Sequence, residues 1–457
     1  MILQRFFGCL LGISLLGLTS MAGAAETVSL DRDESRRMAL EYSKQVKMSE
    51  NRLDQALLRE EIARAAQLPE LKASGLYFYS PDEIGFMLDP LFLLGMESGL
   101  PDLIGEVIPD IDLEIGLEGV TMGGVEMDQV VYAGGRVRIA RRMAQTGTSL
   151  ASIDIDLQKT EVIAMADAAF YRYVSVLEME KAAEKYLELL EELVESVSDS
   201  KSEGLATRND LLKVKVRRNE ARLQVQEAGS GRELARMDLC RILGLPLHTP
   251  LEVMGEISIS EEEIMPLEQY DQRISQRPEY QMLEKSIEIS EQQAKMARAE
   301  MLPEIGLRAG YSYLGGIEIG GQTSDNTSLS AMALVRIPIF NWSESRNKLA
   351  VARLQKEEAR LEKQDVATKL QLDMAKARLQ LEDALTRMEL TASARDYAEE
   401  NLQTSQDKYH EGTETLTDLL EAQAQWQAAL SDHIDAETAV KTRKTMYLKA
   451  IGELTIQ

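Results

Sequence analysis

The sequence predicts a mainly α-helical protein with a β-barrel part, in which one structural pattern occurs twice along the chain. Three observations support this fold class. Two long stretches contain almost no helix-breaking residue, and shorter segments beside them alternate apolar and polar residues. The same motifs also recur in the same order in both halves of the chain. Together they predict that each half contributes a pair of strands and a pair of long helices.

The N-terminus has the features of a cleavable secretory signal over residues 1–24. Arg5 supplies the positive charge, Phe6–Leu18 supplies the apolar core, and Ala22–Ala24 supplies the small residues before the cleavage point. The apolar stretch is too short to be a convincing transmembrane helix. We therefore expect an exported protein, with an uncleaved membrane anchor as the alternative.

Composition narrows the possible functions of the remaining chain. Loss of Arg5 with the signal takes the formal charge from −25 to −26, and such acidity argues against a nucleic-acid partner. No later segment reaches the roughly 18 uninterrupted apolar residues that a spanning helix requires. If the chain crosses a membrane, it must therefore do so as a closed β-barrel. Cys240, the only cysteine beyond the signal, cannot form an intramolecular disulfide.

The internal repeat is carried by two pairs of matching motifs. Residues 63–71 match residues 297–305 at six of nine positions, with an offset of 234. Residues 203–212 match residues 411–420 at six of ten positions, with an offset of 208. The offset falls by 26 between the two pairs, so the first copy carries 26 extra residues, which lie within residues 79–111. The common order makes duplication the better interpretation.

The duplication divides the chain into two copies with the same plan of helix, β-hairpin and long helix pair. The first structural repeat covers residues 25–244, with its hairpin at about 69–132 and its helix pair turning near residue 204. A linker follows at 245–265. The second repeat covers residues 266–457, with its hairpin at about 303–340 and its helix pair turning near residue 412.

The strand prediction rests on period-two alternation in residues 111–117, 305–313 and 329–337. One face of these segments is strongly polar and the other carries tyrosines, as in transmembrane strands of about 9–11 residues. A buried face in a soluble sheet is the alternative. Four strands cannot close a barrel, which needs at least about eight, so a chain with membrane-spanning strands must oligomerise.

The helix prediction rests on residues 136–201, with no proline and only Gly147, and on residues 342–410, with neither proline nor glycine. A helix of about 65 residues would be roughly 100 Å long. Apolar residues recur at alternating four- and three-residue spacing, which is typical of coiled coils. Such helices must gain most of their stability by packing against neighbours.

At this point the sequence resembles the TolC-like outer membrane efflux protein family (outer membrane factors), over essentially the whole chain after the signal. The resemblance is carried by the Leu-Pro-Glu motifs and the Gly-x5-Asp-Leu-Leu turns of both copies, and by Tyr132–Arg136 with its counterpart Ile337–Trp342. It implies a trimeric twelve-stranded outer-membrane β-barrel, continuous with a long periplasmic α-helical coiled-coil barrel. The linker and the C-terminal tail would form a belt around the middle of the tunnel. Residues 79–111 would be an ordered surface loop or a partial plug over the mouth.

The resemblance also implies a function, namely the exit duct of a tripartite efflux or type I secretion system. Expected partners are two further copies of the chain, a periplasmic adaptor (membrane fusion) protein, an inner-membrane pump of the RND, ABC or MFS type, and outer-membrane lipid. The expected location is the outer membrane of a Gram-negative-type cell, with a periplasmic helical extension. The alternative is a periplasmic coiled-coil structural or adaptor protein without a barrel. A passive porin would not need so long a tunnel.

No enzymatic activity is expected. The three histidines show no metal-ligand spacing, and the chain contains no phosphate-binding loop or nucleophile elbow. We therefore expect neither a cofactor nor a metal ion. The methionines are dispersed along the sequence, which favours core packing over metal export.

In the family, the two glycine turns between the long helices dock the adaptor. A glycine accepts the positive φ at which one helix stops, and a threonine just beyond it can cap the next helix. The resemblance therefore implies adaptor contacts at Gly204, Leu205, Ala206, Thr207, Gly412, Thr413, Glu414 and Thr415. A plain turn between two helices is the alternative.

The family also narrows its closed entrance with rings of acidic side chains. Asp418 and Glu421 occupy the matching positions on one helix face, where they would attract cations. A solvated acidic face is the alternative. Asp210 and Tyr409 match positions that hold the entrance closed. Glu414 stands where a basic partner is expected, so either Lys408 or Arg208 substitutes for it or the closed state is held differently.

Overall fold

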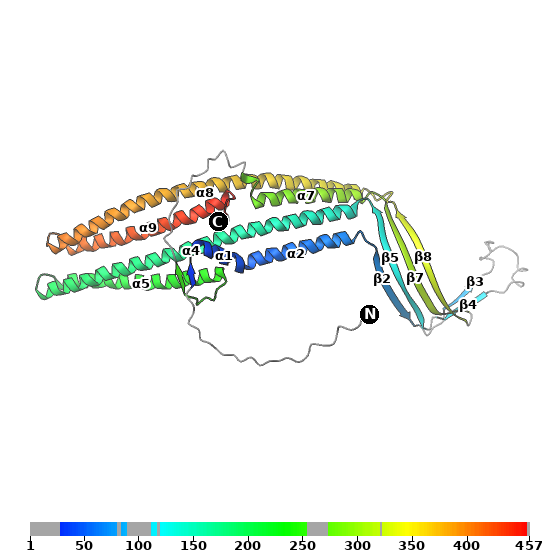
Figure 1. The fold of residues 1–457 in the computed structure, drawn as a ribbon, viewed down its shortest axis with the longest axis horizontal. Helices are drawn as coiled ribbons and strands as arrows, with labels where there is room; N and C mark the ends of the chain where they lie inside the picture. The colour runs from blue at the N-terminus through cyan, green and yellow to red at the C-terminus, as the bar shows by residue number, and fades with distance from the viewer. Residues whose placement is uncertain are drawn as a thin grey trace, which may run out of the picture.

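The computed structural model describes residues 28–79, 84–88, 111–116, 119–253, 273–319 and 322–454. The expected signal, most of residues 79–111 and the later part of the linker lie outside these described residues. Figure 1 shows an elongated molecule, in which long helices run side by side and a ribbon of strands continues from one end of them. The predicted fold class is confirmed.

Two very long helices form the backbone of the molecule. They are α4 (Arg136–Ser202) and α8 (Glu344–His410), each of 67 residues. At one end they turn back into α5 (Arg208–Leu243) and α9 (Leu416–Ala450). Near the sheet they pack against α2 (Lys44–Ala65) and α7 (Pro278–Ala299), and α1 (Arg32–Tyr42) packs on α4. None of the described helices is both long and apolar enough to cross a membrane.

The helices reproduce the repeat that the sequence predicts. α2 and α7 have 22 residues each, and their first residues, Lys44 and Pro278, stand at the offset of 234. The first residues of α4 and α8, Arg136 and Glu344, stand at the offset of 208. The two copies meet where α4 packs against α7 and α9. The chain therefore folds as two similar units joined along α4.

The sheet contains four long strands in the order β2, β5, β7, β8, all antiparallel. Their bounds are Glu70–Phe78, Val120–Ala133, Glu304–Ile319 and Gln322–Arg336. Two short strands, β3 (Ile84–Leu88) and β4 (Ile111–Gly116), pair with each other, and β4 also touches the end of β7. Each copy thus supplies one long hairpin.

One strand expectation needs correction. The alternating residues 111–117 were expected to supply a membrane strand of about 9–11 residues, but residues 111–116 form the short β4 and residue 117 lies outside the described residues. The long return strand of the first hairpin is β5, which pairs with both β2 and β7. Gly123 and Gly124 interrupt the alternation of β5, so the period-two pattern is weaker in β5 than in the shorter strand.

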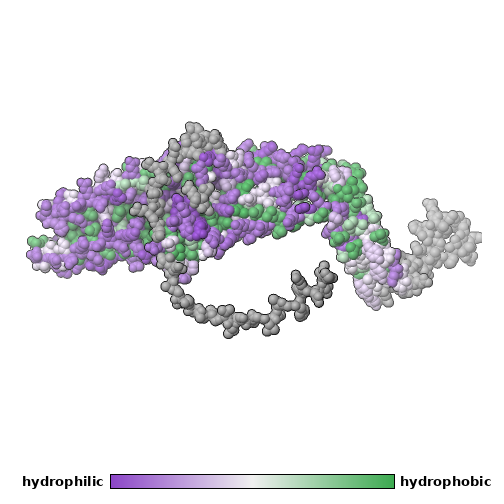
Figure 2. All heavy atoms as spheres, viewed as in Figure 1, coloured by the Kyte–Doolittle hydropathy of each residue, from purple (hydrophilic) through white to green (hydrophobic). Residues whose placement is uncertain are grey.

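The sheet has two faces of different character. Directly opposed residues of antiparallel strands share a face, so the registers assign Lys72, Glu126, Asp128 and Arg308 to the same side. Arg308 bonds Asp128 at 2.7 Å across the strands. The other face carries Leu71, Val125, Met127, Leu307, Tyr311, Tyr313 and Val335. In Figure 2 hydrophobic residues gather where the helices pass into the strands.

The first copy is tied together near the middle of the helices. β1 (Val28–Leu30) pairs in parallel with β6 (Leu251–Val253) at the start of the linker. Beneath this pair lies an apolar core that includes Leu30, Phe170 and Leu239, none of them more than 1% exposed. Burying such side chains contributes about 1.5–3 kcal/mol each. The linker therefore begins anchored on the first copy.

A buried carboxylate, Asp167, links the two copies at the same level. Both guanidinium donors of Arg36 on α1 reach the carboxylate of Asp167 on α4, each at 2.7 Å. Thr445 on α9 donates to the same carboxylate at 2.7 Å. The Arg36 and Asp167 side chains are only 5% and 1% exposed. Three helices from both copies therefore share one desolvated charge pair.

Asp167→Ala is expected to destabilise the helical part by about 3–5 kcal/mol, because it leaves the Arg36 charge buried without its partner. Thermal unfolding of the detergent-solubilised protein, followed by circular dichroism, measures the loss. Replacing the pair together, as Arg36→Met with Asp167→Leu, should recover most of it. Asp156→Ala, at an exposed carboxylate of the same helix, is the control. Equal unfolding temperatures for Asp167→Ala and Asp156→Ala would contradict this account.

Candidate functional site

The candidate site is the end of the helices that lies farthest from the sheet. Figure 1 shows the α4–α5 turn and the α8–α9 turn at the same end of the molecule. A shared core of buried residues joins the two helix pairs there, with Val197 and Leu211 from the first copy and Leu416 and Trp426 from the second. The structure therefore brings together the two glycine turns that the sequence singled out.

Both turns have the same geometry. Gly204 and Gly412 have φ values of 79° and 74°, in the left-handed region that favours glycine. The amide N–H groups of Leu205 and Thr413 donate to carbonyls of the preceding helix, at 2.8 and 2.9 Å. These bonds satisfy helix-end carbonyls that would otherwise lack a partner.

Each turn ends in a capping box. In the first turn the Thr207 hydroxyl donates to Oδ2 of Asp210 at 2.6 Å and accepts from the Asp210 amide at 3.2 Å. In the second turn Thr415 and Asp418 repeat this arrangement at 2.6 and 3.3 Å. Capping of this kind fixes the direction in which the returning helix starts. Asp210 and Asp418 therefore have the same local role in the two copies.

The residues expected to contact an adaptor differ in exposure. Leu205 is 80% exposed. Gly204, Thr207, Gly412, Thr413 and Thr415 are also exposed, whereas Ala206 and Glu414 are half-buried. The first turn thus presents an apolar side chain at its tip, and the second presents a threonine.

The expected acidic pair lies on the surface of α9. Asp418 and Glu421 are both exposed, and Gln425 donates to Glu421 at 3.2 Å. One oxygen of Asp418 is occupied by the capping box. Glu421 is not part of the capping box, so a substitution there would test an electrostatic role without disturbing the turn.

Asp210 and Tyr409 lie close enough to interact. Burial raises the pKa of Tyr409, and the nearby Asp210 carboxylate raises it further. The cation beside Asp210 is Lys213, one turn along the same helix at 3.8 Å. Hydrogen bonds from Thr207, with a smaller effect of Lys213, hold the pKa of Asp210 below its usual value.

Glu414 folds back onto the helix before it. Its Oε1 accepts a hydrogen bond from the buried Ser405 hydroxyl at 3.1 Å, and its Oε2 is buried without a hydrogen-bond partner among the described residues. An inward carboxylate at the position expected to be basic is a contact that the sequence did not indicate. Ser405, nine positions earlier, gave no signal because serine is common on helix surfaces.

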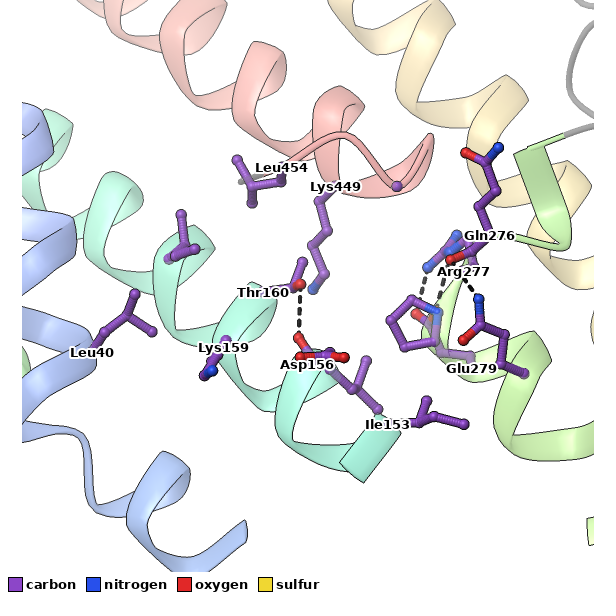
Figure 3. Close-up of a pocket in the computed structure, with 15 residues that line it drawn as sticks. Leu40, Ile153, Asp156, Lys159, Thr160, Gln276, Arg277, Glu279, Lys449 and Leu454 are labelled. Atoms are coloured by element: carbon purple, nitrogen blue, oxygen red, sulfur yellow. Dashed lines mark hydrogen bonds and ion pairs between the residues drawn. The ribbon is translucent and has the colours of Figure 1, made fainter. Parts of the chain in front are cut away.

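A cavity of about 420 Å³ lies where the two copies meet, between α1, α4, α7 and the end of α9 (Figure 3). Its charged side chains largely have partners already. Arg277 bonds Glu279 and the Ala450 carbonyl, and Lys449 pairs with Glu161 at 2.7 Å. Groups of three or more metal-binding side chains are absent from the part of the chain that the structure describes. The cavity is therefore interpreted as a joint between the copies.

The capping box predicts a pH-dependent tip. Because the folded pKa of Asp210 is depressed, its contribution to stability is present above its unfolded pKa of about 4 and is lost as pH falls through the folded value. Protection of the amides of Thr207, Asp210 and Leu211 against hydrogen exchange, corrected for intrinsic rates, is expected to fall on acidification while mid-α5 protection persists.

Thr207→Ala is the matched variant for this test. It should cost about 1 kcal/mol of local stability at neutral pH. It should also reduce the pH dependence of protection, because it removes the hydroxyl bond that lowers the pKa of Asp210 most and leaves only the bond from the backbone N–H of residue 207. The same pH dependence in Thr207→Ala and the unmodified protein would exclude this origin.

This chain is similar to known outer-membrane proteins in both sequence and fold. Residues 270–453 match the family model described as outer membrane efflux protein. Protein CyaE of Bordetella pertussis is 24% identical over 255 residues, which make up 55% of this chain and 53% of that protein. The chain thus spans about half the length of that relative.

Solved structures match nearly the whole chain. The Campylobacter jejuni CmeC outer membrane channel has a TM-score of 0.73 and 17% identity, covering 92% of this chain and 85% of that one. The outer membrane protein VceC of Vibrio cholerae has a TM-score of 0.71 and 15% identity, covering 92% and 96%. The open state of the Neisseria gonorrhoeae MtrE outer membrane channel has a TM-score of 0.70 and 18% identity, covering 92% and 88%.

Residues 270–453 match the family model by sequence, and 92% of the chain matches the CmeC channel by fold. Two of the three matching structures are outer membrane channels. Part of this chain is therefore similar in sequence to the outer membrane efflux proteins, and nearly all of it has the fold of the outer membrane proteins named above.

Proposed function

We propose that this protein is the exit duct of a tripartite efflux or type I secretion system, assembled as a homotrimer. The observation that carries the proposal is the direct continuation of a two-faced sheet into helices of 67 residues. The sheet suits the outer membrane, and helices roughly 100 Å long suit a conduit through the periplasm. A periplasmic adaptor without membrane strands would not account for the sheet.

Trimerisation is proposed because the described residues of one chain supply four long strands. A barrel needs at least about eight, and three copies would provide twelve. The second support is the set of apolar side chains on α8 that find no cover in the single chain, among them Leu354, Leu361, Leu372 and Tyr397. Neighbouring copies would bury these side chains.

The partners are proposed to meet the protein at the paired turns. A periplasmic adaptor would dock over Gly204–Thr207 and Gly412–Thr415, where the exposed Leu205 offers an apolar contact. An inner-membrane pump of the RND, ABC or MFS type would deliver the substrate. Asp418 and Glu421 would form the acidic ring of the entrance, and Asp210 with Tyr409 would help to keep it closed.

The purified trimer is expected to form ion channels in planar bilayers, with a preference for cations that comes from the acidic entrance. Glu421→Gln should lower the cation-to-anion permeability ratio, because it removes three carboxylates from the ring and leaves the capping box intact. Glu362→Gln, at an exposed carboxylate of α8 far from the turn, is the control. Inserted trimers that never conduct ions would refute the proposal that the protein is an exit duct.

The same bilayer recordings test the closure contact. Asp210→Ala combined with Tyr409→Phe should raise single-channel conductance several-fold, because it removes the charge and the hydroxyl that lie between the helix pairs. Thr207→Ala alone controls for loosening of the cap at the same turn. Unchanged conductance in the double variant would show that these residues do not hold the entrance closed.

A further inference from the structure

The start of α4 carries an unusual cluster of positive charge. Four arginines stand within its first seven residues, although the formal net charge of the chain is −25. They are Arg136, Arg138, Arg141 and Arg142, and no acidic residue lies among them. The first turn of a helix favours acidic side chains, because the helix dipole already places positive potential there. The stability of α4 therefore does not explain this cluster.

Most of these arginines have no anionic partner within the described part of the chain. Arg136 is the exception, because it pairs with Glu304 at 2.9 Å. Arg138 and Arg142 lie one helical turn apart, and both are exposed. The Nε atom of Arg141 is buried and has no hydrogen-bond partner among the described residues. An anion from outside the chain would satisfy these guanidinium groups.

The second copy has an exposed arginine at the same place. Arg138 is the third residue of α4, and Arg346 is the third residue of α8, at the offset of 208. Arg346 is exposed and forms no ion pair with a described residue. Lys348, two positions later, pairs with Glu344 at 2.9 Å and with Glu300 at 3.5 Å. An arginine without an ionic partner therefore stands just below the sheet in both copies.

An aromatic side chain precedes each of these two arginines by six residues. Tyr132 precedes Arg138 and lies on the apolar face of the sheet, opposite Ile305. Phe340 precedes Arg346 and is 74% exposed. Exposed aromatic residues at the end of an apolar strand face are typical of the membrane–water interface, at the level of the lipid headgroups. The apolar surface thus ends where the helices begin, which is where hydrophobic residues gather in Figure 2.

Trp342 marks the same boundary. Trp342 and Ser343 have φ values of 48° and 69°, where the first copy has Gly134 and Gly135. A left-handed φ favours glycine, so the indole is held there at a cost in backbone strain. It is 88% exposed and packs edge-on against the Phe340 ring, with the ring centres 5.0 Å apart. Lipid headgroups offer an indole both apolar contact and hydrogen-bond acceptors, whereas a water-filled tunnel offers no apolar contact.

We propose that Arg138 and Arg346 bind the phosphate groups of anionic phospholipids in the leaflet that faces the periplasm. A guanidinium group binds phosphate through two parallel hydrogen bonds, and basic side chains beside an apolar membrane surface are attracted to anionic lipids. Zwitterionic headgroups carry an ammonium group that offsets their phosphate, so anionic headgroups are preferred. The lipid site rests on the proposed duct, because it requires the sheet to span the outer membrane.

Native mass spectrometry of the full-length protein tests this preference. The detergent-purified protein is mixed with equal amounts of phosphatidylglycerol and phosphatidylcholine, and the lipids that it retains are counted. The unmodified protein should retain several-fold more phosphatidylglycerol. Arg138→Gln with Arg346→Gln should bring the two lipids to about equal retention, because the apolar contacts stay and the guanidinium groups are gone. Arg138→Lys with Arg346→Lys should keep part of the preference, because the charge remains without the paired hydrogen bonds.

Arg172→Gln with Arg387→Gln is the matched control. It removes the same charge from exposed arginines of α4 and α8 that lie about 50 and 60 Å farther along these helices. It should leave the lipid preference unchanged, so an equal loss in both glutamine variants would overturn the site.

Planar-bilayer recordings separate the lipid site from a role inside the tunnel. If Arg138→Gln with Arg346→Gln changes the cation-to-anion permeability ratio and leaves the lipid preference intact, the arginines line the tunnel and the lipid site is wrong. An unmodified protein that conducts ions but retains both lipids equally would also overturn the site, and would leave the duct standing. An unmodified protein that prefers phosphatidylglycerol but never conducts would instead refute the duct alone.

Discussion

The structure depends on how the unpaired backbone N–H and C=O groups at the two open edges of its sheet are satisfied. Unpaired N–H and C=O groups cost several kcal/mol each in hydrocarbon, where no water can satisfy them. β2 and β8 each present such a row of groups along one edge. A single chain of this protein cannot resolve that cost in a membrane. Its strands become stable there only when other strands cover both edges.

The duplicated chain offers a simple way to meet this constraint. The β5–β7 contact already joins one copy of the unit to the next, with long helices running on from both. A comparable contact between chains would give both open edges a partner strand. The helices have the same need, because helices of 67 residues with exposed leucines gain their stability from neighbours. At mid-length, Asp167 of the first copy pairs with Arg36 and accepts a hydrogen bond from Thr445 of the second copy, so it links the two copies.

The sequence predicted the fold class because its signals were long and repeated. Neither of the two long stretches contains a proline, which would end or kink a helix. The glycine turn of the first copy also recurs in the second at the offset of 208. Which of two neighbouring segments would form the long strand was harder to predict. Residues 111–117 alternate better than β5 in sequence. However, β5 pairs along most of its length with both β2 and β7, whereas β4 pairs with the short β3 and only the end of β7.

The site residues show the same limit. The two turns could be located from glycine and threonine, whose backbone and capping preferences are local. The bond from Ser405 to Glu414 and the proximity of Tyr409 to Asp210 depend on how helices pack, which residue spacing does not reveal. The capping of Asp418 could have been inferred from its spacing to Thr415. Its role at the entrance, like that of Glu421, depends on the assembled oligomer.

The central claim is that three copies of this chain share one sheet and one tunnel. Native mass spectrometry of the detergent-purified protein tests it most directly, because it counts the chains in the intact complex. The account predicts a complex of three chains that dissociates on heating. A stable particle of one or two chains that still inserts into membranes would contradict it, because four or eight strands from these chains would then have to close without the third copy.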